Sequence, residues 1–286
     1  QARDRSAKGV AFDDYERKLA RLLVSQNNNK NPPQSQVQSL TNLYKDGQLA
    51  EVIKKSHALT IEYPNALTVW NMLGAAAAQT GKLDQALLAF RKMITIKPDH
   101  IQALNNLGLV LKEQGKTDEA LEAFNSAIAS EPNYMEAHYN MGCCLQIIGD
   151  SNKAILAFNK AIDIKPDYAD AHHNLGVIFN EQNKLQEATT SFSKALAIKS
   201  DSAATYFNLG NIFQKQAKSE DAKEAYNNAI KIKPEYAEAY NNLGTVFYAQ
   251  GKLEEALEAY RKSLDIRPDY AEALNNTGTS LLGQGR

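Results

Sequence analysis

The sequence contains very little cysteine. Its 286 residues include two cysteines, Cys143 and Cys144, and these are adjacent. Adjacent side chains on a helix point about 100° apart, so the pair indicates neither a structural disulfide nor a metal site. We therefore expect no bound metal and no cofactor.

The chain also lacks an excess of charge of either sign. It has 32 Lys and Arg residues against 33 Asp and Glu residues, which gives a formal net charge of -1 at pH 7 and a pI of about 6.6. Nucleic acid is bound through a basic stripe that neutralises phosphates. A near-neutral chain does not predict such a stripe, so we expect no nucleic-acid partner.

Long apolar runs are missing as well. No run approaches the roughly 18 residues of a membrane-spanning helix, and no signal peptide precedes the first periodic segment. We therefore expect no membrane partner and a cytoplasmic location. Gln1 is not a native start, so the sequence leaves open whether a leader preceded it.

What the sequence does have is an internal repeat. The segment 237–270 matches a copy of itself when it is moved by 34 residues in either direction. Ser200 stands where one proline of the repeat would be expected. The prolines that share this 34-residue lattice are Pro64, Pro98, Pro132, Pro166, Pro234 and Pro268.

We number the positions of each unit from the third residue after the lattice proline. Three of these positions hold the same kind of residue from one regular unit to the next. Position 8 is glycine from Gly74 to Gly278, and position 20 is alanine from Ala86 to Ala256. Position 24 is always aromatic, at Phe90, Phe124, Phe158, Phe192, Tyr226 and Tyr260. Small residues at positions 8 and 20 allow the two helices of a unit to approach closely, and the aromatic ring at position 24 fills the seam between units. We predict helix A over about positions 1 to 14, a turn at position 15 and helix B up to the proline.

This pattern resembles the tetratricopeptide repeat (TPR), which has an aromatic-x-x-Leu-Gly-x-x-aromatic helix, an Ala-x-x-x-Phe helix and a closing proline. The first regular unit matches it at Trp70, Leu73, Gly74, Ala86, Phe90 and Pro98. The resemblance covers six regular units over residues 67–270. It implies an all-α superhelix (solenoid) whose concave groove is lined by helix A and binds protein or peptide.

The units at the two ends depart from the pattern. Residues 37–66 keep the period but have Leu40 at the usual glycine and Val52 at the usual alanine, so we predict a degenerate first repeat. Residues 1–36 combine an amphipathic stretch with a polar linker. The stretch is expected either to cap the array or to act as a separate docking or dimerisation helix. Residues 271–286 supply only helix A of a further, truncated unit.

The truncated unit predicts an exposed apolar surface. Leu281 and Leu282 would pack against a helix B that the sequence does not contain. We therefore expect the chain to be a piece of a longer protein, and we expect self-association through the exposed C-terminal end.

Residues that often carry chemistry have structural explanations here. Acidic pairs at unit boundaries, such as Asp167 with Asp170, have the spacing of a capping box, which we prefer to a binding stripe. His138 and His172 take position 4, where sister units have a packing aromatic residue. A metal site that included His173 would lack a third ligand. No nucleophile, base and orienting group recur together, so we expect no catalytic site in this segment.

Asparagine recurs at position 6, on the face of helix A that does not pack against helix B. Asparagine is a poor interior helix former, and its amide can pair with the backbone of an extended peptide. The predicted peptide-binding ladder is Asn106, Asn140, Asn174, Asn208, Asn242 and Asn276. It is similar to the ladder of the TPR superhelix of O-linked N-acetylglucosamine transferase, which holds substrate polypeptide by its backbone. Alternatively, these amides bond to neighbouring helices and shape the superhelix.

Position 5 is aromatic in the middle units. Tyr139, His173 and Phe207 would form an apolar patch in the centre of the groove that selects peptides. The alternative is that the next repeat covers these side chains. We expect neither the patch nor the asparagine ladder to belong to the seam between helices.

Two functions stay open at this point. The chain is either a protein-protein interaction module, or the substrate-recognition or oligomerisation arm of a larger enzyme whose catalytic domain lies C-terminal to it. The N-terminal TPR arms of bacterial glycosyl-, sulfo- and methyltransferases are similar to this chain, including the degenerate first unit.

Overall fold

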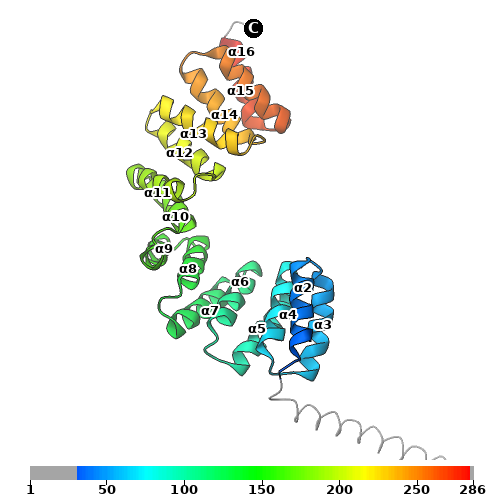
Figure 1. Ribbon diagram of the computed structural model, residues 1–286. Coiled ribbons are helices and arrows are strands. Elements are labelled where there is room, and N and C mark those ends of the chain that lie inside the picture. Colours follow the sequence, from blue (N-terminus) through cyan, green and yellow to red (C-terminus); the bar gives the residue numbers. More distant parts are fainter. Residues whose placement is uncertain (1–30, 284–286) are drawn as a thin grey trace, which may run out of the picture. The chain divides into compact units, whose positions relative to one another are not determined.

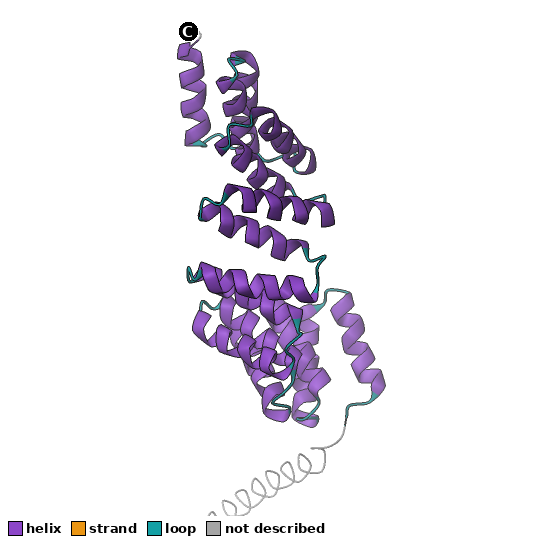
Figure 2. Ribbon diagram, turned by 90° about the vertical axis from the view of Figure 1, so that its left-hand side faces the viewer, coloured by secondary structure: helices purple, strands orange, loops and turns teal. Residues whose placement is uncertain are grey.

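The computed structural model describes residues 31–283, and the regular elements in that range are all α-helices (Figures 1 and 2). The helices are α2 (Gln34–Lys45), α3 (Leu49–Glu62), α4 (Leu67–Gln79), α5 (Leu83–Ile96), α6 (Ile101–Glu113), α7 (Thr117–Ser130), α8 (Met135–Ile147), α9 (Ser151–Ile164), α10 (Ala169–Glu181), α11 (Leu185–Ile198), α12 (Ala203–Lys215), α13 (Ser219–Ile232), α14 (Ala237–Ala249), α15 (Leu253–Ile266) and α16 (Ala271–Gly283). None of these helices is long and apolar enough to cross a bilayer. The predicted all-α fold is confirmed, and the amphipathic stretch expected before residue 31 lies outside the described residues.

The helices follow the period of the sequence. From α4 to α15, helices of 13 residues alternate with helices of 14 residues. Helix α11 ends at Ile198, two residues before Ser200, so the missing proline does not change where helix B stops. Helix α2 begins at Gln34, and residues 34–36, which we expected in the linker, are therefore helical.

The chain divides into two compact units, Gln1–Cys144 and Leu145–Arg286, and the division falls within α8. In the first unit, α2, α3, α4, α5 and α6 each pack against the next helix along the chain. The second unit repeats this arrangement from α9 to α16, and each helix A also touches the next helix A, as α12 does α14. The core of each unit is therefore continuous between neighbouring repeats.

The close approach of helix A to helix B depends on glycine at position 8. A Cβ atom added to Gly108 would lie 2.5 Å from the ring of Phe124, and one added to Gly210 would lie 2.6 Å from the ring of Tyr226. Both rings are fully buried. The predicted seam is thus a ring lying directly on a glycine, and no larger residue fits at this distance without displacing the ring.

Helix A ends in a left-handed residue at position 15, as predicted. The glycines there have φ between 71° and 80°, while Asn183 has φ 58° and Ala217 has φ 57°. Alanine in this conformation costs roughly 1–2 kcal/mol because its Cβ crowds the following carbonyl oxygen.

The predicted capping boxes are wrong. Helix α10 begins after Tyr168, whose side chain makes no capping hydrogen bond. Asp167 instead lies within the turn closed by the hydrogen bond from the Tyr168 N–H to the Lys165 carbonyl, at 3.2 Å. The side chains that do cap a helix A are His100 and Ser202, which accept hydrogen bonds from Ala103 and Thr205.

The last helix has an open apolar face. Leu282 is 77% exposed and Leu274 is 51% exposed, whereas Leu281 is half-buried. A Cβ atom added to Gly278 would meet nothing within 4 Å, because no ring covers this glycine. The predicted exposure is therefore confirmed for Leu282 and only partly for Leu281.

The glycine–ring contact can be tested with matched alanine variants. Gly108→Ala should lower the free energy of unfolding by about 1–3 kcal/mol, since the added methyl group overlaps the ring of Phe124. Gly278→Ala adds the same methyl group at the same repeat position in open space, and should be neutral or stabilising by up to about 1 kcal/mol. Urea denaturation measures both changes. Equal losses in the two variants would contradict the packing account.

The strained turn gives a prediction of opposite sign. Ala217→Gly should raise the free energy of unfolding by about 0.5–1 kcal/mol, because glycine relieves the left-handed strain but has a more flexible unfolded state. Asn183→Gly should gain less, since asparagine tolerates this conformation. Thermal and urea denaturation would show the difference, and an unchanged or destabilised Ala217→Gly protein would be inconsistent with the strain.

Candidate functional site

A groove of 580 Å³ opens on the helix A face of the second unit. We call it the unit 2 groove. Its lining residues are Asn180, Phe207, Asn211, Gln214, Lys215, Glu238, Asn242, Thr245, Tyr270 and Glu272. Apart from Tyr270, which directly precedes α16, they occupy positions 2, 5, 6, 9, 12 and 13 of α10, α12, α14 and α16. This is the helix A face that the sequence predicted to line a groove.

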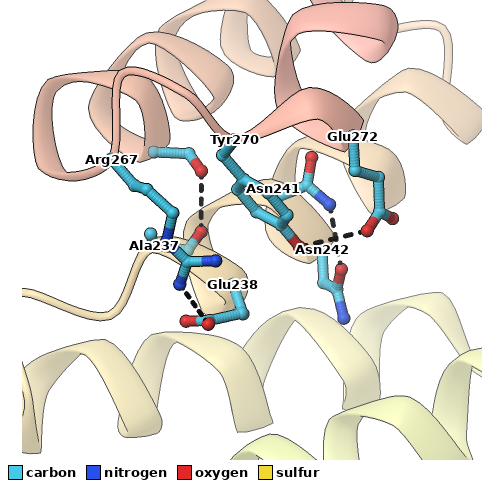
Figure 3. A network of polar contacts seen from close by, with 8 residues as sticks. Ala237, Glu238, Asn241, Asn242, Arg267, Tyr270 and Glu272 are labelled. Atoms are coloured by element: carbon cyan, nitrogen blue, oxygen red, sulfur yellow. Dashed lines mark hydrogen bonds and ion pairs between the residues drawn. The ribbon is translucent and has the colours of Figure 1, made fainter.

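A network of polar contacts fixes one end of the unit 2 groove (Figure 3). Glu238 forms an ion pair with Arg267, and the guanidinium of Arg267 lies 4.6 Å from the centre of the Tyr270 ring. The Tyr270 hydroxyl donates a hydrogen bond of 3.0 Å to Glu272. Partial burial tends to raise the pKa of Glu238, but hydrogen bonds from Arg267 and the backbone outweigh it and hold that pKa below its usual value. Burial and the acceptor Glu272 raise the pKa of Tyr270 to about 12.

Three asparagines of the predicted ladder bind the preceding helix A. In the first unit, the amide of Asn140 donates to the side-chain oxygen of Asn105 at 2.9 Å. In the second, Asn276 donates to Asn241 at 3.0 Å, and Asn242 donates to Asn211 at 2.9 Å. These amides connect consecutive repeats, so the alternative that they shape the array describes all three.

The other asparagines of the ladder are placed differently. Asn106 and Asn208 are half-buried, and their side chains make no hydrogen bond within the described part of the chain. Asn106 lines a second groove of 350 Å³ in the first unit, together with Tyr44, Phe90 and Leu109. Asn174 is half-buried as well. Position 6 therefore contains both amides that hold repeats together and amides that are available.

The aromatic residues at position 5 contact the next repeat. The ring of Phe207 lies 5.0 Å from that of Tyr236, which precedes the following helix A. Nδ1 of His173 lies 2.8 Å from the hydroxyl of Thr205 on α12. Our expectation that these residues lie outside the seam is wrong for both. Tyr139 is half-buried and belongs to the first unit.

The histidines at position 4 have a structural role that the sequence did not predict in full. Nε2 of His138 lies 2.9 Å from the carbonyl oxygen of Pro132, and His172 makes the equivalent contact of 3.1 Å with Pro166. A carbonyl oxygen only accepts, so Nε2 must carry the proton. Trp70 donates to the carbonyl of its own lattice proline in the same way, at 2.8 Å. Both histidines are buried, as expected of a packing residue.

The described residues do not form a metal-binding site. Within residues 31–283, no cluster of three or more His, Cys, Asp or Glu side chains is placed to hold a metal ion. Neither Cys143 nor Cys144 forms a disulfide, and burial raises the pKa of Cys144 to about 11. Burial holds the pKa of His173 below its ordinary value, against the opposing effect of Asp170, so this imidazole is neutral at neutral pH.

Sequence reasoning missed most of the groove lining. It named Phe207 and Asn242 as site residues, assigned the boundary acids Glu238 and Glu272 to capping boxes, and gave no role to Asn211 or Tyr270. Positions 2, 9 and 13 lie on the same face of a helix as position 6. Comparing each of them between all repeats would have pointed to Asn211 and Glu238. Tyr270 precedes the helix, and no periodic position of helix A includes it.

Paired antiparallel helices, a 34-residue period and a ring lying on a glycine define a tetratricopeptide-repeat protein. Residues 16–278 match the family model described as the cilia and flagella-associated protein 70 C-terminal domain. The chain belongs to this family. No curated protein is a match for it.

Many solved structures share the fold. The pilF protein of Pseudomonas aeruginosa has 18% identity and a TM-score of 0.67, with 74% of this chain and 97% of that chain covered. The C-terminal part of a TPR protein from Cytophaga hutchinsonii has 17% identity and a TM-score of 0.66, with coverages of 84% and 98%. YrrB, described as a TPR protein with an unusual peptide-binding site, has 21% identity and a TM-score of 0.57, with coverages of 65% and 96%. At these identities the similarity concerns the fold alone.

Two asparagines at the same repeat position give a direct test of their different placement. Asn140→Ala should lower the free energy of unfolding by about 1–3 kcal/mol, because it leaves the buried oxygen of Asn105 without its donor. Asn106→Ala removes no hydrogen bond and should stay within about 0.5 kcal/mol of the wild type. Thermal and urea denaturation provide the comparison. Similar losses in both variants would show that the two amides are not distinct.

Proposed function

We propose that this chain is a non-catalytic protein-interaction module that holds an extended peptide on its helix A faces. The observation that carries the proposal is the composition of the unit 2 groove. The ring of Phe207 lies among the amides of Asn211, Gln214 and Asn242, so an apolar surface is bordered by donors and acceptors. An extended peptide presents the same combination, with N–H and C=O groups along its backbone and apolar side chains between them.

Only part of the predicted ladder is assigned to binding. Asn106 and Asn208 have unengaged amides, and we assign to them the pairing with the peptide backbone. Asn140, Asn242 and Asn276 already connect repeats, and their contribution is to keep the groove in shape. Binding to a preformed surface costs less ordering of side chains than binding to a flexible one.

Magnitudes indicate that these amides alone hold a peptide weakly. A neutral hydrogen bond contributes a net of about 0.5–1.5 kcal/mol, whereas association costs an estimated ~4–15 kcal/mol. Several pairings with the backbone do not clearly exceed that cost. A specific ligand must therefore also bury apolar side chains, and Phe207 offers one surface for them.

The family supports a place in a ciliary or flagellar protein. Its description as the C-terminal domain of a cilia and flagella-associated protein favours an interaction module in such a protein over the arm of a transferase. We accordingly propose the cytoplasmic space of cilia or flagella as the working location. Imaging of a tagged full-length protein in ciliated or flagellated cells tests this, and exclusion from these organelles would contradict it.

Self-association through α16 is a secondary expectation. It is motivated by the exposed side chains of Leu274 and Leu282. Sedimentation of the wild type and of a Leu274→Gln, Leu282→Gln variant compares their association states. An unchanged association state would rule out this surface as the contact.

The binding proposal is tested with a peptide library titrated by fluorescence polarisation. Replacing Asn106 and Asn208 together with Ala should weaken all binders by about fivefold or more, since each lost hydrogen bond contributes about 0.5–1.5 kcal/mol. The matched control replaces Asn125 and Asn159, two exposed asparagines of helix B, and should change nothing. A library without binders, or equal losses in both variants, would overturn the proposal.

A further inference from the structure

Within the second unit, a tyrosine precedes each helix A but one. Position 34, the last of the unit, is Tyr168 before α10, Tyr236 before α14 and Tyr270 before α16. Before α12 the same position is Ser202. The second unit therefore lacks one ring of an otherwise regular series.

The repeat that follows shows what this ring contacts. The ring of Tyr236 lies 5.0 Å from the ring of Phe207, which stands at position 5 of the preceding helix A. The ammonium group of Lys233 lies 4.6 Å from the centre of the same ring. The tyrosine is thus held between a position 5 side chain and a lysine at position 31.

The side chains that would contact a tyrosine at position 34 are both present around Ser202, although the tyrosine is not. His173 is the residue at position 5 and Lys199 the residue at position 31, each 34 residues before Phe207 and Lys233. They line a pocket of 180 Å³ together with Ser202, Ala169 and Ala195. A cavity of about 150 Å³ lined by apolar groups is enough to bind benzene, so this pocket has room for one aromatic ring.

The polar groups of the pocket are suited to a ring rather than to an ion. The hydroxyl of Thr205 already contacts Nδ1 of His173 at 2.8 Å and the hydroxyl of Ser202 at 2.7 Å. Asp170 and Lys199 contribute charges of opposite sign. The alanines form an apolar wall, and neither the carboxylate of Asp170 nor the cation of Lys199 makes a hydrogen bond or an ion pair within the described residues. A cation attracts the face of an aromatic ring.

We propose that this pocket binds the aromatic side chain of a peptide ligand, which takes the place of the tyrosine that the repeat lacks. The inference rests on the proposed function in that a peptide carries the ring to the helix A face. It adds the anchor that the asparagine amides do not supply, and it predicts that ligands contain phenylalanine or tyrosine.

The pocket can be tested without a known ligand. N-acetyl-tyrosinamide should produce saturable NMR shifts at the methyl groups of Ala169, Ala195 and Thr205 in the wild type. Ser202→Tyr introduces the ring found at the three sister positions of the second unit, and should abolish these shifts. Ser202→Ala leaves the pocket open and should still bind the probe. Absence of saturable shifts at these methyl groups in the wild type, or probe binding that Ser202→Tyr leaves unchanged, would overturn the inference.

Peptide titration separates this inference from the groove proposal. Ser202→Tyr should weaken aromatic-containing peptides by about tenfold or more, since burial of an aromatic side chain is worth at least that factor, and should leave other peptides unaffected. If all aromatic peptides bind Ser202→Tyr as well as they bind the wild type, the inference about the pocket is wrong, whereas the proposal about the unit 2 groove is not affected. If no peptide binds but N-acetyl-tyrosinamide still shifts the pocket methyl groups, the pocket stands and the groove proposal fails.

Discussion

The contact between a glycine at position 8 and an aromatic ring at position 24 sets the geometry of each repeat. It brings helix A so close to helix B that a single methyl group at Gly108 would overlap Phe124. With that distance fixed, the opposite face of helix A is turned away from helix B and left to line a groove. At Gly278 the ring is missing, and the helix has an open apolar face instead.

The groove face serves two purposes, and the side chains around each asparagine decide which one applies. Asn276 binds Asn241, which lies 35 residues before it. The residue 35 positions before Asn208 is His173, which contacts Thr205 instead. The amide of Asn208 is therefore left available. Stability and binding are divided among residues of one type at one repeat position, so a substitution at position 6 affects folding in some repeats and recognition in others.

The sequence predicted the parts that depend on local chemistry. These include the helix periods, the left-handed turn at Ala217 and the seam beneath each ring. It did not predict which amides of position 6 bond to a neighbouring repeat, or which residue directly precedes each helix A. Asn106 follows Asn71, which also offers an acceptor, yet the two side chains make no hydrogen bond in the described structure. Asp167 has the spacing of a cap, but the turn after Pro166 places it one residue too early. A comparison of position 34 between repeats would have shown from the sequence that Ser202 stands where sister repeats have a tyrosine.

NMR mapping of the asparagine side-chain amides during titration with a bound peptide shows directly whether the helix A face, and not helix B, receives the ligand. We expect shifts at Asn106 and Asn208, while Asn125 and Asn159 on helix B stay unchanged. Shifts confined to the helix B amides would contradict this expectation.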